Sequence, residues 1–274
     1  MKSFALALGG GGARGLAHIA VIEVLDELGV RPVAVAGTSI GALVGAAYAA
    51  GMSGKELRRY VIALAHTPGE ITRRLIAARA GTFVDLFAGA FGQATQLDAE
   101  KFCKEFLPEA VPAEFSALAT PLIVMTTDLH RRAELPFSAG PLRPALAASI
   151  AIPGLFRPVV SGDGRILVDG GATNPLPFDT LSGRADRIVA VDVFGIPAAE
   201  RSDMPSVWES VFATVMIMGS TIVAAKHKTA PPDLTIRPNV AIFRTLDFRQ
   251  ASAILRAAEA TKAQMRDEIA ALLA

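Results

Sequence analysis

The beginning of the chain alternates twice between a short apolar run and a longer apolar pattern with helical spacing. Residues 3–8 and 33–36 form the short runs, and each is followed by a glycine-containing turn. Apolar residues then recur at helical spacing over residues 16–28, and an Ala- and Leu-rich helix is predicted from the second turn to about Gly51. This order requires crossover connections between parallel strands. The sequence therefore predicts an α/β fold whose mainly parallel sheet carries helices on both faces.

The rest of the chain continues in the same style, and no Pro/Gly/Ser-rich linker or low-complexity tail divides it. Further strands are predicted at residues 121–127, 165–168, 187–194 and 234–237, and further helices at 141–150, 207–226 and 248–273. We therefore expect residues 1–274 to form a single domain, in which the C-terminal part, 196–274, has the weaker pattern.

Composition narrows the classes of function. With 51% hydrophobic and 19% charged residues, 274 residues can bury a full core. The net charge is only +1, so nucleic acid is not an expected partner. The single cysteine, Cys103, excludes an intrachain disulfide and fits a reducing compartment.

Three apolar stretches bear on localisation. The run at residues 3–8 ends in glycines too early for a signal peptide, which predicts a cytoplasmic protein. The uncharged stretch 32–54 is interpreted as a buried strand, turn and helix, and 211–225 is short for a membrane span. For the helix at 207–226, a core position is preferred over a dimer face.

A Gly-x-Ser-x-Gly pattern, Gly37-Thr38-Ser39-Ile40-Gly41, follows the second predicted strand and precedes a helix. In this setting the pattern is typical of a nucleophile elbow. Gly37 and Gly41 leave room for the tight turn, which presents the Ser39 hydroxyl above the carboxyl ends of the strands. The alternative is a plain Gly/Ser turn between two buried elements. We predict that Ser39 is the nucleophile of an ester hydrolase.

The glycine loop Gly10-Gly11-Gly12-Ala13-Arg14-Gly15 follows the first predicted strand and also satisfies Gly-x-Gly-x-x-Gly. A dinucleotide site would have an acidic residue at the end of the second strand, and this chain has none there. The amides of Gly10, Gly11 and Gly12 suit an oxyanion hole instead, since they can stabilise the charge that forms on an attacked carbonyl oxygen. A nucleotide- or phosphate-binding regulatory module is the alternative from another functional class.

A nucleophilic serine needs a base within hydrogen-bond reach. A Ser–Asp–His order could use His227, but this residue lies between two lysines at a predicted helix end, where a solvated role is expected. Asp169 ends an apolar strand and precedes Gly170 and Gly171, so its carboxylate would stand at the same sheet edge as the serine. We therefore predict a Ser39–Asp169 dyad and keep a His227-dependent esterase as the alternative. The competing carboxylates are Asp128 and Asp192.

Four ordered blocks resemble the patatin-like phospholipase family in its bacterial members. They are the glycine loop at 10–15, the serine turn at 37–41, the segment 148–156, and Asp169-Gly170-Gly171 with the Asn174-Pro175 pair that follows. The resemblance covers roughly residues 3–195. It implies a three-layer α/β/α sandwich and hydrolysis of acyl chains from phospholipids, lysophospholipids or other lipid esters, with no metal and no cofactor.

The resemblance also assigns roles to individual residues. Ser39 would attack the acyl carbonyl, and Asp169 would accept its proton and later activate water. Gly11 and Gly12 would supply the oxyanion amides, while Arg14 would brace the loop or meet head-group charge. The glycines that would support these motifs are Gly15, Gly37, Gly41, Gly170 and Gly171.

Residues 67–96 mix arginines, Arg73, Arg74 and Arg79, with apolar and aromatic residues. Two interpretations stay open: a cap or lid over the site, or a helix pair packed on the sheet with its arginines in water. If it forms a lid, this segment could bind to an anionic membrane surface. The expected partner is a lipid or acyl-ester substrate. Peripheral contact with the inner membrane surface is also expected, and the oligomeric state stays open.

Overall fold

A central sheet of 8 strands organises the molecule, in the order β5-β6-β3-β2-β1-β7-β8 with β4 paired to β3. The computed structural model describes residues 2–79, 96–194, 204 and 207–274. Parallel ladders join β3, β2, β1, β7 and β8, whereas β4, β5 and β6 run antiparallel to their partners. The strands are β1 Phe4–Leu8, β2 Ala34–Thr38, β3 Leu122–Asp128, β4 Ala133–Phe137, β5 Val159–Val160, β6 Ile166–Asp169, β7 Arg187–Val191 and β8 Leu234–Ile236.

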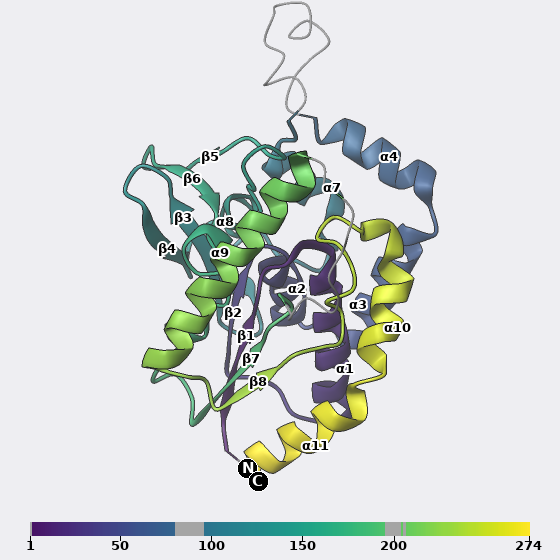
Figure 1. Cartoon of the computed structure of the whole chain (residues 1–274), viewed down its shortest axis with the longest axis vertical. Helices are drawn as coiled ribbons and strands as arrows, with labels where there is room; N and C mark the ends of the chain where they lie inside the picture. Colours follow the sequence, from purple (N-terminus) through teal and green to yellow (C-terminus); the bar gives the residue numbers. More distant parts are fainter. Residues whose placement is uncertain (1, 80–95, 195–203, 205–206) are drawn as a thin grey trace, which may run out of the picture.

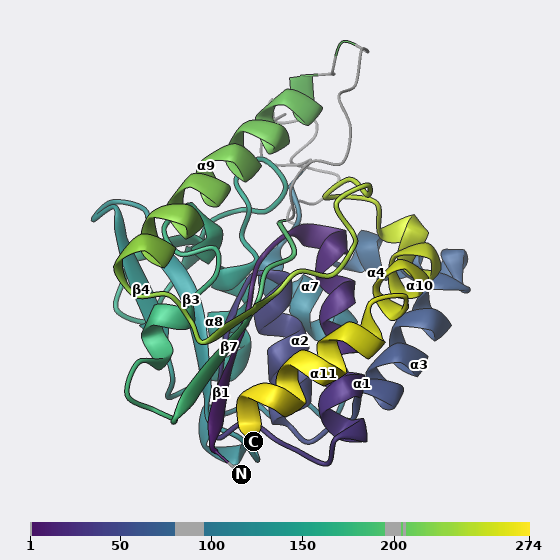
Figure 2. The ribbon, with the colours of Figure 1, turned by 60° about the horizontal axis from the view of Figure 1, so that its bottom comes forward.

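Helices lie on both faces of this sheet (Figures 1 and 2). One face carries most of them, and α9 crosses the other, where η4 also packs. The helical elements are η1 Gly12–Ala17, α1 His18–Glu27, α2 Ile40–Ala49, α3 Gly54–Ala65, α4 Pro68–Ala77, α7 Ala99–Phe106, η2 Phe115–Ala117, α8 Leu142–Ser149, η3 Gly170–Ala172, η4 Phe178–Leu181, α9 Val207–Thr229, η5 Phe248–Gln250, α10 Ala251–Glu259 and α11 Lys262–Leu273.

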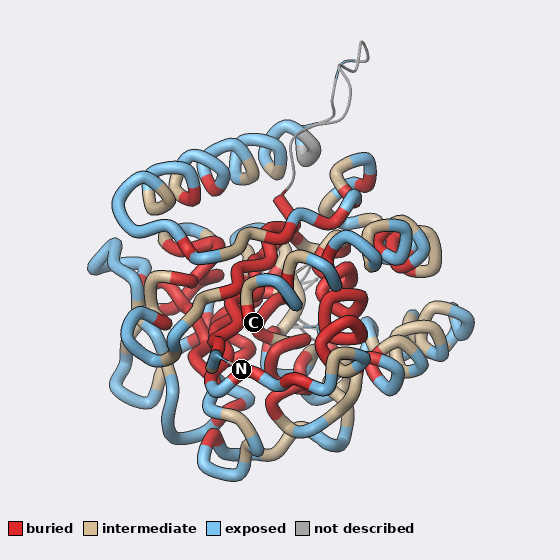
Figure 3. The backbone as a smooth tube through the Cα atoms, turned by 90° about the horizontal axis from the view of Figure 1, so that it is seen from below, coloured by how far each residue is buried: buried red, intermediate tan, exposed pale blue. Residues whose placement is uncertain are grey.

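The side-chain alternation of β1 separates a thick core from a thin one. Its large side chains, Leu6 and Leu8 among them, join the main core with α1, α2, α8, α10 and α11. Ala5 and Ala7 point to the other face and join a small cluster that includes Val223 of α9. Figure 3 shows the buried residues concentrated in the sheet and the helices of the main core. The predicted α/β fold with helices on both sheet faces, as in a three-layer α/β/α sandwich, is confirmed.

Most predicted elements are present, with small shifts of their ends. The Ser53–Glu56 capping box at the start of α3 is formed, with each residue's side chain bonded to the other's backbone amide. The stretch 32–54 is a buried strand, turn and helix, as predicted. The predicted helix at 248–273 is instead η5, α10 and α11, and no Gly or Pro marks the break between the two α-helices.

The preference for a core position of the helix at 207–226 is wrong. Only Gly219 and Val223 are buried among the α9 residues whose burial is described, and apolar side chains such as Ile217 (66% exposed) and Met218 (59%) face outward. In the described part of the chain, the segment Ser210–Thr229 is long and apolar enough to cross a membrane, with a mean hydropathy of 1.3. Only 11% of its apolar stretch is buried inside the protein. A helix that is apolar all round carries no signal for which side faces the protein.

Candidate active site

Ser39 stands at the sharp turn between β2 and α2. Its φ of 55° is in the left-handed region, which among described non-glycine residues only Arg132 shares. A Cβ on Gly37 would lie 2.6 Å from the Gly41 carbonyl oxygen, and one on Gly41 would lie 2.2 Å from the Leu8 carbonyl oxygen. Both positions therefore exclude a side chain. Strain of this kind collects at functional sites, where the surrounding structure holds the residue in place.

The structure brings Ser39 and Asp169 into direct contact. The Ser39 hydroxyl donates a hydrogen bond to Asp169 Oδ2 at 2.6 Å, and both side chains are buried. Asp169 ends β6, and its other carboxylate oxygen accepts the Gly171 amide at 2.7 Å. A Cβ on Gly170 would lie 2.3 Å from the Met125 carbonyl oxygen, so the turn after the aspartate also depends on glycine.

The environment of Asp169 changes its proton affinity. Burial raises the pKa of the Asp169 carboxyl to about 6, although the hydrogen bonds from Ser39 and Gly171 act in the opposite direction. At neutral pH the group is mostly ionised, and it can still accept a proton more readily than an ordinary aspartate. This combination suits a general base.

The glycine loop lies beside the serine. A Cβ on Gly10 would be 3.5 Å from the Ser39 Cβ, and Gly11 and Gly12 have φ values of 145° and 59° that favour glycine. The Gly10 amide already donates to the Pro175 carbonyl at 2.9 Å. Within the described residues, the amides of Gly11 and Gly12 have no hydrogen-bond acceptor. Of the three predicted oxyanion donors, these two are available.

Two buried side chains that the sequence did not single out support the site. Ser149 Oγ accepts the Ser39 amide at 2.9 Å, which holds the turn against α8. His18 Nε2 lies 2.8 Å from the Gly9 carbonyl oxygen, and burial lowers the His18 pKa to about 4. A neutral His18 therefore donates its Nε2 proton to the strand end that carries the glycine loop. Ser149 belongs to the 148–156 segment of the resemblance, which was its only signal.

Carbonyl groups of Phe194 and of the C-terminal part of the chain hold the glycine loop in place. Arg14 donates to the carbonyl oxygens of Phe243 and Phe194 at 2.7 and 2.6 Å. The Ala13 amide donates to the Thr245 carbonyl oxygen at 2.7 Å. We call these contacts between residues 13–14 and the carbonyls of Phe194, Phe243 and Thr245 the C-terminal clasp. Of the two roles expected for Arg14, these contacts match the bracing of the loop.

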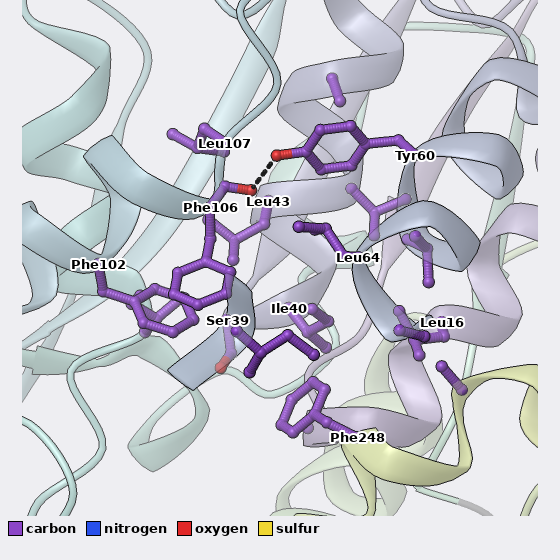
Figure 4. Close-up of a pocket in the computed structure, with 18 of the residues that line it drawn as sticks. Leu16, Ser39, Ile40, Leu43, Tyr60, Leu64, Phe102, Phe106, Leu107 and Phe248 are labelled. Atoms are coloured by element: carbon purple, nitrogen blue, oxygen red, sulfur yellow. Dashed lines mark hydrogen bonds between the residues drawn. The ribbon is translucent and has the colours of Figure 1, made fainter. Parts of the chain in front are cut away.

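Ser39 opens into an apolar pocket of about 440 Å³. This volume is typical of sites for small organic ligands, which span about 300–1,000 Å³. Figure 4 shows Ser39 among aliphatic and aromatic side chains from η1, α2, α3 and α7, with Phe248 approaching from the C-terminal part. Tyr60 turns its hydroxyl to the Phe106 carbonyl oxygen at 3.1 Å, which leaves its ring as pocket wall. The site can hold an apolar chain next to the Ser39 hydroxyl.

The segment 67–96, for which a lid is one of two interpretations, is described in its first half and at residue 96. Ile71 and Leu75 of α4 line the pocket, while Arg73 and Arg74 both pair with Glu70. Residues 80–95 lie outside the described part of the chain. The α4 helix is thus a wall of the pocket.

The competing candidates lie in other contacts. His227 packs its ring against Phe178 with centroids 4.9 Å apart, on the face of the sheet that α9 covers. Asp192 pairs with Arg237 at 3.1 Å, and Asp128 accepts the Arg131 amide. The geometry therefore gives no support to a His227-dependent triad. Among the described residues, no group of three His, Cys, Asp or Glu side chains is placed to hold a metal ion.

Comparisons with known proteins converge on one family. The family model for patatin-like phospholipase matches residues 6–182. An uncharacterised NTE family protein of Mycobacterium tuberculosis is 38% identical over 200 residues, which cover 73% of this chain and 51% of that protein. The mouse patatin-like phospholipase domain-containing protein 6 is 31% identical over 70% of this chain and 14% of its own length. This chain thus spans about half the length of the first of these relatives.

A solved structure shows the same fold. VipD from Legionella pneumophila superposes with a TM-score of 0.52 at 16% identity, over 97% of this chain and 67% of that one. The matched family region contains the glycine loop, the serine turn and the aspartate turn that the structure brings together. The chain belongs to the patatin-like phospholipase family.

Proposed function

We propose that the protein is a serine hydrolase that cleaves acyl esters of lipids, in the phospholipid or lysophospholipid class. The observation that carries the proposal is the 2.6 Å hydrogen bond from the Ser39 hydroxyl to the buried Asp169 carboxylate. The apolar pocket beside Ser39 supports a long-chain acyl group as the part of the substrate that is bound. Membership of the patatin-like phospholipase family supports the same class of reaction.

The proposed reaction has two halves. Ser39 Oγ attacks the ester carbonyl carbon while Asp169 Oδ2 takes the hydroxyl proton, and the amides of Gly11 and Gly12 stabilise the oxyanion. Asp169 then returns the proton to the departing alcohol, which leaves an acyl group on Ser39. In the second half, Asp169 takes a proton from water as the water attacks the acyl carbonyl. Collapse of this intermediate, with return of the Asp169 proton to Ser39 Oγ, releases the fatty acid and restores the serine.

Labelling of the nucleophile tests the proposal. A fluorophosphonate probe is expected to modify the wild-type protein at one serine, and peptide mapping should place the label on the peptide that contains Ser39. Ser39→Ala should show neither label nor hydrolysis across a panel of lipid esters. Ser161→Ala is the control, because it removes a serine hydroxyl from the turn between β5 and β6, outside the pocket, and should keep both the label and hydrolysis. Full esterase activity in purified Ser39→Ala would overturn the proposal.

The pH dependence of hydrolysis should follow the raised pKa of Asp169. Below pH about 6 the carboxyl is protonated and cannot accept the serine proton, so kcat/KM for a soluble ester should fall as pH falls through this value. His18, with its pKa lowered to about 4, stays neutral through this range. Circular dichroism at each pH separates titration from unfolding. A fall of kcat/KM near pH 4, where an ordinary aspartate titrates, would contradict the assignment of Asp169 with its raised pKa as the base.

The organisation of the chain is part of the proposal. We infer that residues 1–274 act as one domain, because the C-terminal clasp and Phe248 complete a site whose catalytic pair lies in the first 169 residues. We also infer that α4 belongs to a cap over the acyl pocket, since Ile71 and Leu75 line it. The cytoplasmic location at the inner membrane surface stays a prediction.

A further inference from the structure

The outer face of α9 is an apolar surface that the described chain leaves uncovered. No charged residue occurs from Ser210 to Ala225. The exposed side chains of this outer face are Val207, Val211, Val215, Ile217 and Met218, each 44% or more exposed. Large exposed apolar surface of this kind marks a site of interaction with another apolar body.

The helix is held firmly along its inner face. A Cβ on Gly219 would lie 2.8 Å from the Phe194 ring, so the helix approaches the body closely there, and Val223 is buried in the small core. Near the end of the helix, Lys226 forms ion pairs with Glu134 at 2.8 Å and Asp179 at 2.5 Å. The orientation of α9 is thus fixed, and its apolar outer face is directed away from the protein.

The hydroxyl groups of α9 identify the kind of partner. Thr214, Ser220 and Thr221 are exposed, and each donates its hydroxyl to the backbone carbonyl four residues earlier, at 2.8, 2.9 and 3.0 Å. Side chains that bond back to their own helix need no hydrogen-bond partner outside it. A hydrocarbon environment offers no such partner and penalises charge, whereas protein interfaces carry about one hydrogen bond per 100–200 Å². The outer face of α9 matches hydrocarbon better than it matches a protein surface.

The position of α9 relates this face to the candidate active site. The helix packs against η3, the turn that follows Asp169. Its N-terminal end rises to the same end of the molecule as α4, and the parallel strands point their carboxyl ends there too (Figure 1). Ile76 of α4 is 57% exposed at that end. A lipid surface in contact with α9 would therefore lie beside the pocket that holds Ser39.

We propose that α9 docks the protein on a lipid bilayer, with its outer face inserted among the acyl chains and its inner face packed on the sheet. This arrangement lies in the membrane interface and does not cross it, because Val223 and Lys226 tie the helix to the body. Docking itself requires only α9. The benefit for catalysis, delivery of a lipid ester to Ser39, rests on the proposed function.

Vesicle binding tests the docking. In co-sedimentation with phosphatidylcholine vesicles, Ile217→Glu is expected to weaken binding by about tenfold or more, since it places a charge where an apolar side chain would enter hydrocarbon. Val33→Glu is the matched control: it adds the same charge at an exposed apolar site (45% exposed) that precedes β2, and binding should be unchanged. Raising the salt concentration should leave wild-type binding intact, because the inserted face has no charge.

Three results separate the explanations. Equal binding by wild type and Ile217→Glu, or no binding by wild type, would overturn the docking. A wild-type dimer that Ile217→Glu dissociates without a change in vesicle binding would overturn it too, since a second copy would then cover α9. Ser39→Ala should bind vesicles as wild type does. If it binds and wild type hydrolyses no ester, the docking stands and the proposed function fails.

Folding of the variant is checked in the same preparation. Ile217→Glu should keep wild-type hydrolysis of a water-soluble short-chain ester, while hydrolysis of lipid dispersed in vesicles should fall with binding. Ile217→Ser provides a second variant of smaller perturbation, with an intermediate loss of binding. Loss of soluble-ester hydrolysis in both variants, in parallel with vesicle binding, would show a structural defect and contradict a specific docking role.

Discussion

Asp169→Asn is expected to reduce hydrolysis by about 10²–10⁴-fold and, at the same time, to stabilise the fold at neutral pH. The first effect follows because an amide cannot accept the Ser39 proton. The second follows from the raised pKa of the Asp169 carboxyl, about 6 in the folded protein. A folded-state pKa above the unfolded value means that ionised Asp169 destabilises the fold as pH rises from about 4 through 6.

The size of this stabilisation can be bounded. A shift of about two pKa units corresponds to roughly 2–3 kcal/mol at pH values above 6, and an asparagine of the same shape carries no charge to desolvate. The thermal unfolding midpoint at pH 7.5 should therefore rise by several degrees. The gain should vanish below pH about 4, where Asp169 is protonated in both states.

Asp192→Asn is the matched control for this prediction. Asp192 is also a buried aspartate, directly after β7, but it pairs with Arg237 and has no described hydrogen bond to Ser39; an asparagine there can still accept the Phe194 amide. Replacement of Asp192 should lower stability and leave hydrolysis near wild type. Because Asp169→Asn creates an Asn-Gly sequence that is prone to deamidation, the mass of each preparation must be checked. A variant of confirmed mass that keeps activity, or that melts below wild type at pH 7.5, would contradict the assigned role.

The parts of the site that the sequence could predict are those with local signals. Ser39 stands between an apolar strand and a helix, with glycines two residues before and after it. Asp169 ends a strand and precedes two glycines. The carboxyl-edge rule for parallel strands does not explain their contact, because β6 runs antiparallel to β3; Asp169 reaches Ser39 because it pairs with Thr126 near the carboxyl end of β3. To predict the contact, one would have to know that β6 pairs with β3 and that β3 pairs with β2.

The parts that the sequence could not predict depend on long-range contacts or on ambiguous patterns. The hydrogen bond from Arg14 to the Phe243 carbonyl joins residues 229 positions apart, and no local sequence pattern near either residue indicates it. The sequence gives no sign that the Gly10 amide has a partner, but this amide donates a hydrogen bond to the Pro175 carbonyl oxygen. The helix α9 is apolar on all sides, so its periodicity could not show that most of it faces outward.

Gly12→Ala should reduce hydrolysis nearly as much as Asp169→Asn does, for a different reason. A Cβ on Gly12 would lie 2.1 Å from the Thr245 carbonyl oxygen, and the φ of 59° is unfavourable for alanine. Because the obstacle is backbone, no side-chain rotation relieves it, and either the glycine loop or the clasp must move. Displacement of one oxyanion amide costs about 2.7–4 kcal/mol of barrier, which is about 10²–10³-fold in kcat.

Gly29→Ala separates this effect from backbone strain alone. Gly29 also has a positive φ, of 67°, but a Cβ there would meet nothing within 4 Å. Both variants should lose about 1–2 kcal/mol of stability from the left-handed conformation. Only Gly12→Ala should lose hydrolysis and slow the fluorophosphonate labelling of Ser39, because the probe also develops negative charge where the oxyanion amides point. Equal activity in the two variants would exclude the Gly12 amide from the oxyanion hole and leave the clasp with a purely structural role.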